Sequence, residues 1–209
     1  MGVLHLGVGT VGAAGAVGTV GAGLRPAPTE TKTCLYPQDL PLHGRSILKA
    51  YPRGLIPCLM RMGLSLEGVR SYAERFVVYR SEVSNLIVTA GKVLVCKMLI
   101  DDGAQWDVGL TYQAIGTSDT APSLSDTQLG TEVARKTPTL KSRSGNEITL
   151  STFYPAADCS YAIEECGIFG SSTAGASANS GEMFSHWLQS YDNSAGDYDL
   201  TFDYVLTVG

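Results

Sequence analysis

Apolar and polar side chains alternate most regularly near the carboxyl-terminal end of the chain. From Tyr198 to Val208, every second residue is apolar and the residues between them are mostly polar. Successive side chains of a strand point to opposite faces of a sheet, so this period of two predicts an antiparallel strand with one face on a core. Alternation or β-rich composition predicts further strands at 111–115, 131–143, 147–154, 161–169 and 182–189.

Turn-forming residues separate the predicted strands. Residues 116–127 and 170–181 are rich in Gly, Ser, Thr and Ala, and they predict two long loops. Residues 144–146 predict a tight turn. Pro138 has no backbone N–H to donate to a neighbouring strand. We therefore expect 131–143 to lie at a sheet edge or to contain a bulge.

A helical period precedes these strands. Four apolar residues share one helix face at i, i+4 spacing: Leu86, Ala90, Leu94 and Met98. They predict a helix over 86–100, with Ser84 or Asn85 as its N-cap. Gly91 lies inside this segment, where a glycine costs about 1 kcal/mol relative to alanine. The helix is therefore expected to depend on tertiary packing.

Two other segments have weaker helical signals. Within 64–82, helical spacing relates Val69, Tyr72, Phe76 and Tyr79, but the sequence around Phe76 is also rich in β-forming residues. This segment is expected to be an amphipathic packing element, either helical or extended. One helical turn is predicted at 127–130, with Ser125 or Asp126 as its cap.

Together these elements predict a mainly β fold. It is expected to be an antiparallel β-sandwich with one or two N-terminal helices packed against it, because apolar sheet faces must be covered by a second layer. Residues 84–209 hold the helix and the sandwich. Residues 61–83 form an amphipathic helical or extended linker.

The first sixty residues are expected to form a disordered or weakly ordered leader. Six of the nine prolines fall within 25–60, where they would interrupt both helix and sheet. Residues 1–24 carry no charge but include eight glycines, which argues against a membrane span. An alternative is that the biological start is Met60 or Met62, with 1–60 an over-extended gene start.

Charge is distributed unevenly along the 209 residues. Residues 1–62 hold six bases and two acids, residues 63–209 hold nine bases and 18 acids, and the net charge is -5. Because a nucleic-acid surface needs a basic patch to displace counterions, nucleic acid is excluded as an expected partner.

The five cysteines form no C-x-x-C pair, so they predict neither a zinc ribbon nor a thioredoxin-like motif. Cys159 and Cys166 could face one another across a turn, but two unpaired thiols are favoured because disulfide geometry is demanding. Cys96 lies in an apolar run and is expected to be a small buried hydrophobe.

The residues that could carry chemistry form no catalytic pattern. His186 is expected to be a packing residue beside Trp187, and residues 175–179 do not complete a serine-hydrolase elbow. Glu164 and Glu165 face opposite ways in a strand, so one of them is expected to point inward and be hydrogen-bonded or to guard an edge. The acidic segment 192–199 fits a solvated hairpin turn better than a calcium loop. No catalytic residue, cofactor or metal ligand is therefore expected.

The order of short motifs along 84–208 resembles that of small structural proteins of tailed bacteriophages, of the tail-fibre and tail-collar type. The motifs are Asn85-Leu86-Ile87-Val88-Thr89-Ala90-Gly91-Lys92, Tyr112-Gln113-Ala114-Ile115-Gly116-Thr117, Thr120-Ala121-Pro122, Asp126-Thr127-Gln128-Leu129-Gly130-Thr131-Glu132-Val133-Ala134-Arg135-Lys136, Ile163-Glu164-Glu165-Cys166-Gly167-Ile168-Phe169-Gly170 and Ser180-Gly181-Glu182-Met183-Phe184-Ser185-His186. This chain departs from the usual pattern at Cys96, Cys166 and 1–60.

The resemblance implies a non-enzymatic virion protein, located in the tail or neck. Such a protein would act as a homo-oligomer or dock on other tail or neck proteins, with no membrane partner. Arg135 and Lys136 are candidate partner contacts, or they keep an edge strand soluble. The alternative function is a carbohydrate-binding adhesion module for host-surface glycans, in which Trp187 and Tyr191 would contact the sugar.

Overall fold

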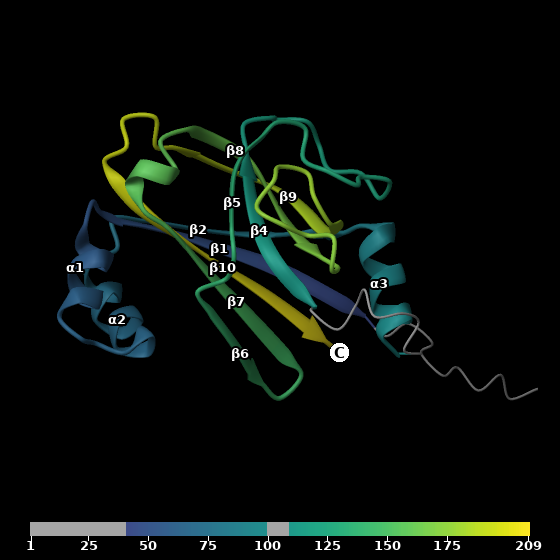
Figure 1. Ribbon diagram of the computed structural model, residues 1–209, viewed down its shortest axis with the longest axis horizontal. Helices are drawn as coiled ribbons and strands as arrows, with labels where there is room; N and C mark the ends of the chain where they lie inside the picture. Colours follow the sequence, from purple (N-terminus) through teal and green to yellow (C-terminus); the bar gives the residue numbers. More distant parts are fainter. Residues whose placement is uncertain (1–40, 100–108) are drawn as a thin grey trace, which may run out of the picture. The chain divides into compact units, whose positions relative to one another are not determined.

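The computed structural model describes residues 41–99 and 109–209, and all of them belong to one compact unit that spans 39–209. Its strands form two antiparallel sheets of five strands each (Figure 1). The first sheet has the order β2 (Tyr79–Ser84), β1 (Leu42–Pro52), β10 (Tyr198–Val208), β7 (Glu147–Tyr154) and β6 (Leu140–Ser144). The second has the order β3 (Leu86–Ile87), β9 (Glu182–Asp192), β8 (Ala162–Gly170), β4 (Leu110–Gly116) and β5 (Glu132–Lys136). The predicted mainly β, antiparallel sandwich is therefore confirmed.

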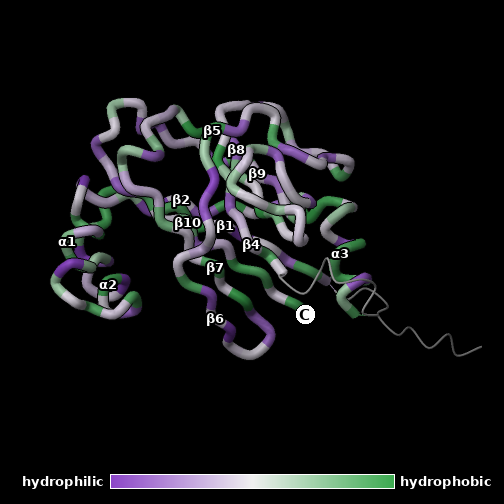
Figure 2. Tube along the Cα trace, viewed as in Figure 1, coloured by the Kyte–Doolittle hydropathy of each residue, from purple (hydrophilic) through white to green (hydrophobic). Residues whose placement is uncertain are grey.

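The chain passes from one sheet to the other at both edges of the sandwich. Strand β2 leads directly into β3 through Asn85, and β5 leads into β6 through a short connection that contains Pro138. The predicted single strand over 131–143 is thus two edge strands in different sheets, and the proline marks the crossing. Figure 2 shows polar residues along β5 and β6, as expected of strands that must not pair with another chain.

The core between the sheets is built from large side chains of both. The ring of Tyr204 on β10 lies 5.6 Å from that of Trp187 and 6.5 Å from that of Phe184, both on β9. Tyr154 and Phe202 meet edge-on at 5.6 Å within the first sheet. These contacts bury the apolar face of β10 that the alternating sequence predicted.

Both sheets are covered on their outer faces as well. Helices α1 (Leu55–Arg61) and α2 (Leu66–Ala73), followed by the 3-10 turn η1 (Glu74–Phe76), cover the first sheet. Their buried side chains form a second apolar cluster, which contains Tyr51, Ile56, Leu59, Val69 and Ala73. Two long loops cover the second sheet, over a third cluster formed by Val88, Ala114, Leu129, Phe169 and Met183.

The polar face of β10 is buried by this arrangement, although its sequence suggested a solvated face. Asp203 is 3% exposed and binds Lys49 of β1 at 3.6 Å and Arg70 of α2 at 3.0 Å. Asp199 is 1% exposed and accepts hydrogen bonds from the backbone N–H groups of Gly54 and Ala156, at 2.9 Å each. The acids of the last strand therefore hold the covering elements to the sheet.

The expectation of a weakly ordered leader over 1–60 is wrong for the part that is described. Strand β1 pairs with β10 along Leu42–Pro52 and with β2 over Arg45–Ala50, so it is an inner strand. A chain that began at Met60 or Met62 would lack this strand. Residues 1–40 lie outside the described residues.

The predicted helix over 86–100 exists but begins later. Helix α3 spans Thr89–Leu99, because Leu86 and Ile87 pair with β9 as β3 and Val88 N–H donates to Phe184 O. Neither Ser84, which ends β2, nor Asn85 caps it. Gly91 faces Phe184 O so closely that a methyl group there would overlap it. The glycine therefore allows α3 to lie directly on β9.

Two smaller expectations are corrected, and one that left two alternatives open is resolved. Residues 127–130 form no helical turn. The segment 64–82, expected to be helical or extended, contains both: α2 and η1 reach Phe76, and β2 begins at Tyr79. Cys96 is exposed rather than buried, whereas Cys159 and Cys166 are buried free thiols, as favoured from the sequence.

The position of β1 gives a direct prediction. The fragment 39–209 should unfold in one cooperative thermal transition, whereas 62–209 should not fold, because it leaves β10 and β2 without their shared partner strand. Circular dichroism during heating measures both. A cooperative transition of the shorter fragment within about 4 °C of the longer one would contradict the assignment of β1 to the core.

Candidate functional site

Glu165 on β8 is the centre of the polar network under the two long loops. Its side chain is fully buried, and its two oxygens accept hydrogen bonds from three backbone N–H groups: Thr131 at 2.7 Å, Gly130 at 2.9 Å and Ser118 at 3.3 Å. A buried carboxylate is tolerated only when such donors replace water. The loop 117–131 therefore begins and ends on one acid.

Gly116 makes this approach possible. It is the last residue of β4, and a methyl group on its Cα would overlap both Glu165 Oε1 and Thr131 O. Only glycine lets the carboxylate reach the two ends of the loop. The glycine at position 116 is thus explained by its contact with Glu165, a residue about fifty positions later in the chain.

His186 on β9 joins the same network from the neighbouring strand. Its Nε2 lies 3.2 Å from Glu165 Oε2, and its Nδ1 lies 2.7 Å from Asp126 Oδ2 in the middle of the loop. His186 is 4% exposed, so the sequence expectation of a packed histidine is confirmed, but the ring packs between two acids. The loop is therefore attached to the sheet at its centre as well as at both ends.

The electrostatics of Asp126 agree with this attachment. Burial alone would raise the pKa of its carboxyl group, but the Ser123 backbone N–H and His186 outweigh that cost, so the pKa is lowered. A lowered folded-state pKa contributes stability that is present above the unfolded-state pKa and is lost as pH falls through the folded value. Acid therefore weakens the attachment of this loop.

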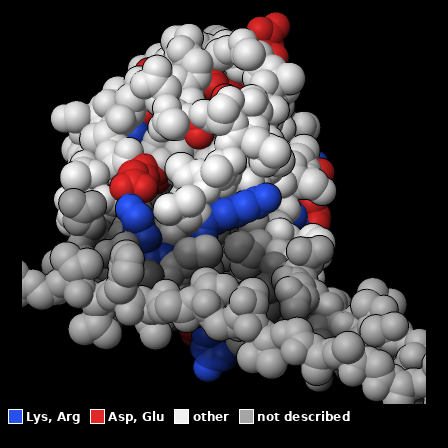
Figure 3. All heavy atoms as spheres, turned by 90° about the vertical axis from the view of Figure 1, so that its right-hand side faces the viewer, with Lys and Arg blue, Asp and Glu red and all other residues white. Residues whose placement is uncertain are grey.

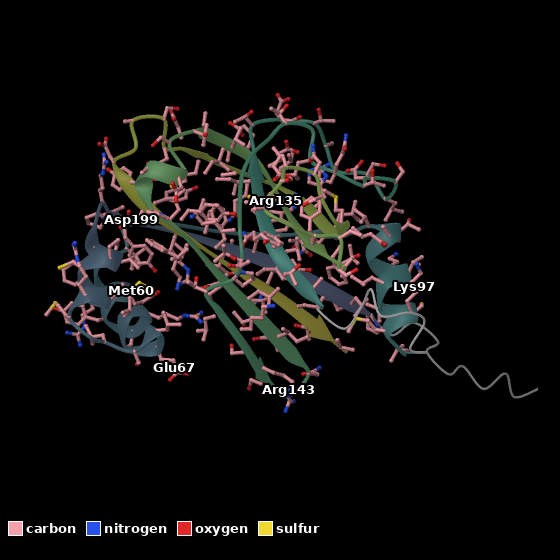
Figure 4. All side chains as sticks on the ribbon, viewed as in Figure 1. Met60, Glu67, Lys97, Arg135, Arg143 and Asp199 are labelled. Atoms are coloured by element: carbon pink, nitrogen blue, oxygen red, sulfur yellow. The ribbon has the colours of Figure 1, made fainter. Side chains whose placement is uncertain are left out.

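Arg135 on β5 holds the second loop, 171–181. Its guanidinium binds Glu132 through two nitrogens, with Nη2 2.7 Å from Oε2, and its Nη1 donates to Ser180 O at 2.8 Å and to Gly175 O at 3.1 Å. The Phe169 ring centroid lies 4.6 Å from its Cζ. Figure 4 shows Arg135 in the interior of this region, in contrast to Glu67 and Arg143 at the periphery.

The surface that these loops present is made mostly of short side chains, with Leu124, which is 51% exposed, as a large apolar exception. Asp119 is the only charged residue in 117–125, and 171–181 contains none. Residues such as Gly, Ala and Ser lose little rotamer freedom when a partner covers them. Figure 3, in which the end of the molecule that carries α3 faces the viewer, shows mostly uncharged atoms above the region drawn in grey. We call the exposed parts of 117–125 and 171–181 the loop surface.

A second candidate feature is an apolar cavity of about 740 Å³ between the sheets, beside α3. Leu94 and Met98 of α3, Leu150 of β7 and Leu206 of β10 contribute to its lining, and Lys141 and Arg143 of β6 lie at its polar side. Both cations already donate to backbone oxygens, Lys141 to Leu110 O and Arg143 to Gly145 O, at 2.7 Å each.

The four partner-contact residues expected from the sequence lie in different places. Arg135 is internally bonded, and Lys136 reaches Asp158 at 2.7 Å with a side chain that is 33% exposed. Trp187 is 1% exposed and lies in the core, where its Nε1 donates to Gln189. The ring of Tyr191 lies between two other tyrosine rings, with centroid distances of 4.7 Å to Tyr79 and 6.3 Å to Tyr198.

The acidic segment 192–199 forms the turn between β9 and β10. Asp192 accepts from the backbone N–H of Ser194, and the side chain of Asn193 donates to Cys159 O and Tyr198 O. Within 41–99 and 109–209, no group of three or more His, Cys, Asp and Glu residues could hold a metal ion. In the same ranges, no helix is long and apolar enough to cross a membrane.

Sequence reasoning found part of this network. It expected one of the paired glutamates to point inward and be hydrogen-bonded, which Glu165 confirms. It missed the partnership of Glu165 with His186 and Asp126, because nothing in the local pattern relates three residues on two strands and a loop. The available signal was an ionisable residue within each mostly apolar strand, at Glu165 and at His186.

Comparison of this chain with protein-family models, with curated proteins and with solved structures found no match.

Substitution of the two neighbouring glutamates tests the network. Glu165→Gln should lower the free energy of unfolding by about 3 kcal/mol, because the amide nitrogen cannot accept the loop N–H groups and the buried charge network is broken. Glu164→Gln, the matched control at the adjacent, half-buried position of β8, should change it by less than about 0.5 kcal/mol. Urea unfolding measures both, and equal effects would contradict the role of Glu165.

Proposed function

We propose that this chain is a non-enzymatic virion structural protein of a tailed bacteriophage, a tail-fibre, collar or neck-associated subunit. It would act by assembling into an oligomer and by docking other tail or neck proteins. The observation that carries the proposal is the loop surface, which is held in place by buried charges and is thereby preformed for contact with another protein.

The energetics of docking support this assignment. Association costs free energy when flexible segments must be ordered at the interface. Here Glu165 and Arg135 already order both loops, through bonds that are complete without a partner. Most side chains on the loop surface are short, so little further entropy is lost when they are covered, and the exposed Leu124 offers apolar area to a partner.

The placement of the resembling motifs also supports it. Residues from four separate motifs, Gly116, Asp126, Glu165 and His186, converge on one network beneath the loop surface. Arg135 and Ser180, from the same motif set, form the second attachment. Residues of these four motifs therefore contribute to one structural feature, the attachment of the two loops to the sheet, and are not scattered turn residues.

The glycan-binding alternative has one observation in its favour. Tyr79, Tyr191 and Tyr198 lie side by side where β2, β9 and β10 meet, and Tyr79 is 37% exposed. Their rings are tilted or edge-on to one another, so they pack mainly among themselves. Trp187, the other aromatic residue expected to stack on a sugar, has no exposed face. The assembly function is therefore preferred.

Incorporation into particles tests the proposal. The protein should copurify with virions through a density gradient, and Asp119→Arg on the loop surface should reduce its incorporation about tenfold or more, since a long charge would be buried against the partner. Glu67→Arg on α2, exposed and remote in Figure 4, is the control and should incorporate normally.

Two outcomes would contradict this function. The first is absence of the wild-type protein from purified virions. The second is binding of the wild-type protein to a glycan array that Tyr191→Ala abolishes, with no association with particles.

A further inference from the structure

His186 has an acid at each ring nitrogen, and this arrangement fixes the number of protons in the network. Nδ1 faces Asp126 Oδ2 at 2.7 Å, and Nε2 faces Glu165 Oε2 at 3.2 Å. A neutral imidazole has one N–H and one lone pair, whereas an ionised carboxylate can only accept. Both short contacts are therefore attractive only when the network holds two protons. A neutral ring between two ionised carboxylates holds one, so the network needs one more.

The surrounding bonds place that proton on the ring. Glu165 accepts from three backbone N–H groups, so both of its oxygens already act as hydrogen-bond acceptors. Asp126 accepts from the Ser123 N–H at 2.7 Å, and its pKa is lowered. With both acids ionised, the contacts require an imidazolium that donates from both nitrogens.

We propose that protonated His186 is a pH-sensitive latch for the loop surface, which holds the middle of the loop, 119–127, to the sheet and releases it when the ring loses a proton. The proposal concerns the chain itself and does not depend on its place in a virion. After deprotonation, a lone pair of the ring would face a carboxylate across a hydrogen-bonding distance, and that contact would become repulsive.

The loop side of the latch is the side that opens. Glu165 is fully buried and keeps its three backbone donors, whereas the Asp126 side chain is 24% exposed and can turn toward water. Opening at Asp126 loosens the middle of the loop, which is then held through Leu124 O, an acceptor for Thr89 N–H at 2.9 Å, while Gly130 and Thr131 stay attached to Glu165. The change therefore alters the loop surface without unfolding the sheet.

Other charged groups near His186 are engaged or exposed. On the strands paired with β9, β8 contributes Glu164 and Glu165, and β3 contributes none. Among the elements packed on β9, α3 brings Lys92, which is exposed, and Lys97. Strand β2 brings Arg80 and Glu82, which pair with Glu74 and Arg45. On β9 itself, Glu182 and Asp192 lie at its two ends.

The second loop supplies an internal control. Residues 171–181 are held by Arg135 and Glu132, and no histidine lies in that attachment. Arginine stays charged at all relevant pH values. The latch therefore predicts that a rise in pH loosens 119–127 and leaves 171–181 unchanged in the same molecule.

Nuclear magnetic resonance of the full-length, ¹⁵N-labelled chain tests the latch, with samples upward from about pH 5. Both ring nitrogens of His186 should carry protons at neutral pH. As the ring loses a proton, hydrogen-exchange protection of the amides in 119–127 should fall about tenfold or more, after correction for intrinsic rates, which corresponds to about 1.4 kcal/mol. Protection in 171–181 should stay constant.

The variant Asp126→Asn completes the test, because its partly exposed position allows the fold to form. It should show low protection in 119–127 at every pH, because the contact between the ring and the Asp126 carboxylate is lost, with 171–181 still protected. A ring that carries one proton at neutral pH in the wild type would overturn the proposal. Unchanged loop protection through the ring titration would overturn it as well.

Discussion

The folded form of this chain depends on a carboxylate that is excluded from water. Glu165 has no exposed surface, and the donors that compensate its burial come from a loop and from a histidine on the adjacent strand. Because an unpaired buried charge costs several kcal/mol, the sheet position of Glu165 dictates where the loop must lie. A buried ion cluster of this kind specifies a conformation more clearly than it adds stability, since desolvation offsets most of the attraction.

Buried charged groups hold the covering elements on both outer faces of the sandwich. Arg135 and Glu132 hold the second loop, and Asp203 and Lys49 hold α2 and the turn after it. The apolar core alone would leave these coverings free to slide, because hydrophobic contact is non-directional. Buried ion pairs with defined donors fix them, and the result is a sandwich whose coverings are as well placed as its strands.

The sequence was informative where structure is local. Alternation predicted β10 and β7, and Pro138 correctly marked a sheet edge. The inner strand β1 was not predicted, because prolines commonly interrupt a strand. Pro41 and Pro52 instead lie just before β1 and at its last residue. The start of α3 was misplaced because Leu86 and Ile87 fit an apolar helix face equally well until β9 is present to pair with them. The ion clusters were missed, apart from an inward glutamate, because they join residues that only the sheet brings together.

The central claim is that buried charges hold the loops as firmly as the strands are held, and backbone amide exchange at neutral pH measures this most directly. The amides of Gly130 and Thr131 donate to Glu165 and to no other strand. They should exchange as slowly as the amides that pair β8 with β9, within about tenfold, because both require sub-global opening. Exchange at the rate of exposed loop amides would contradict the account.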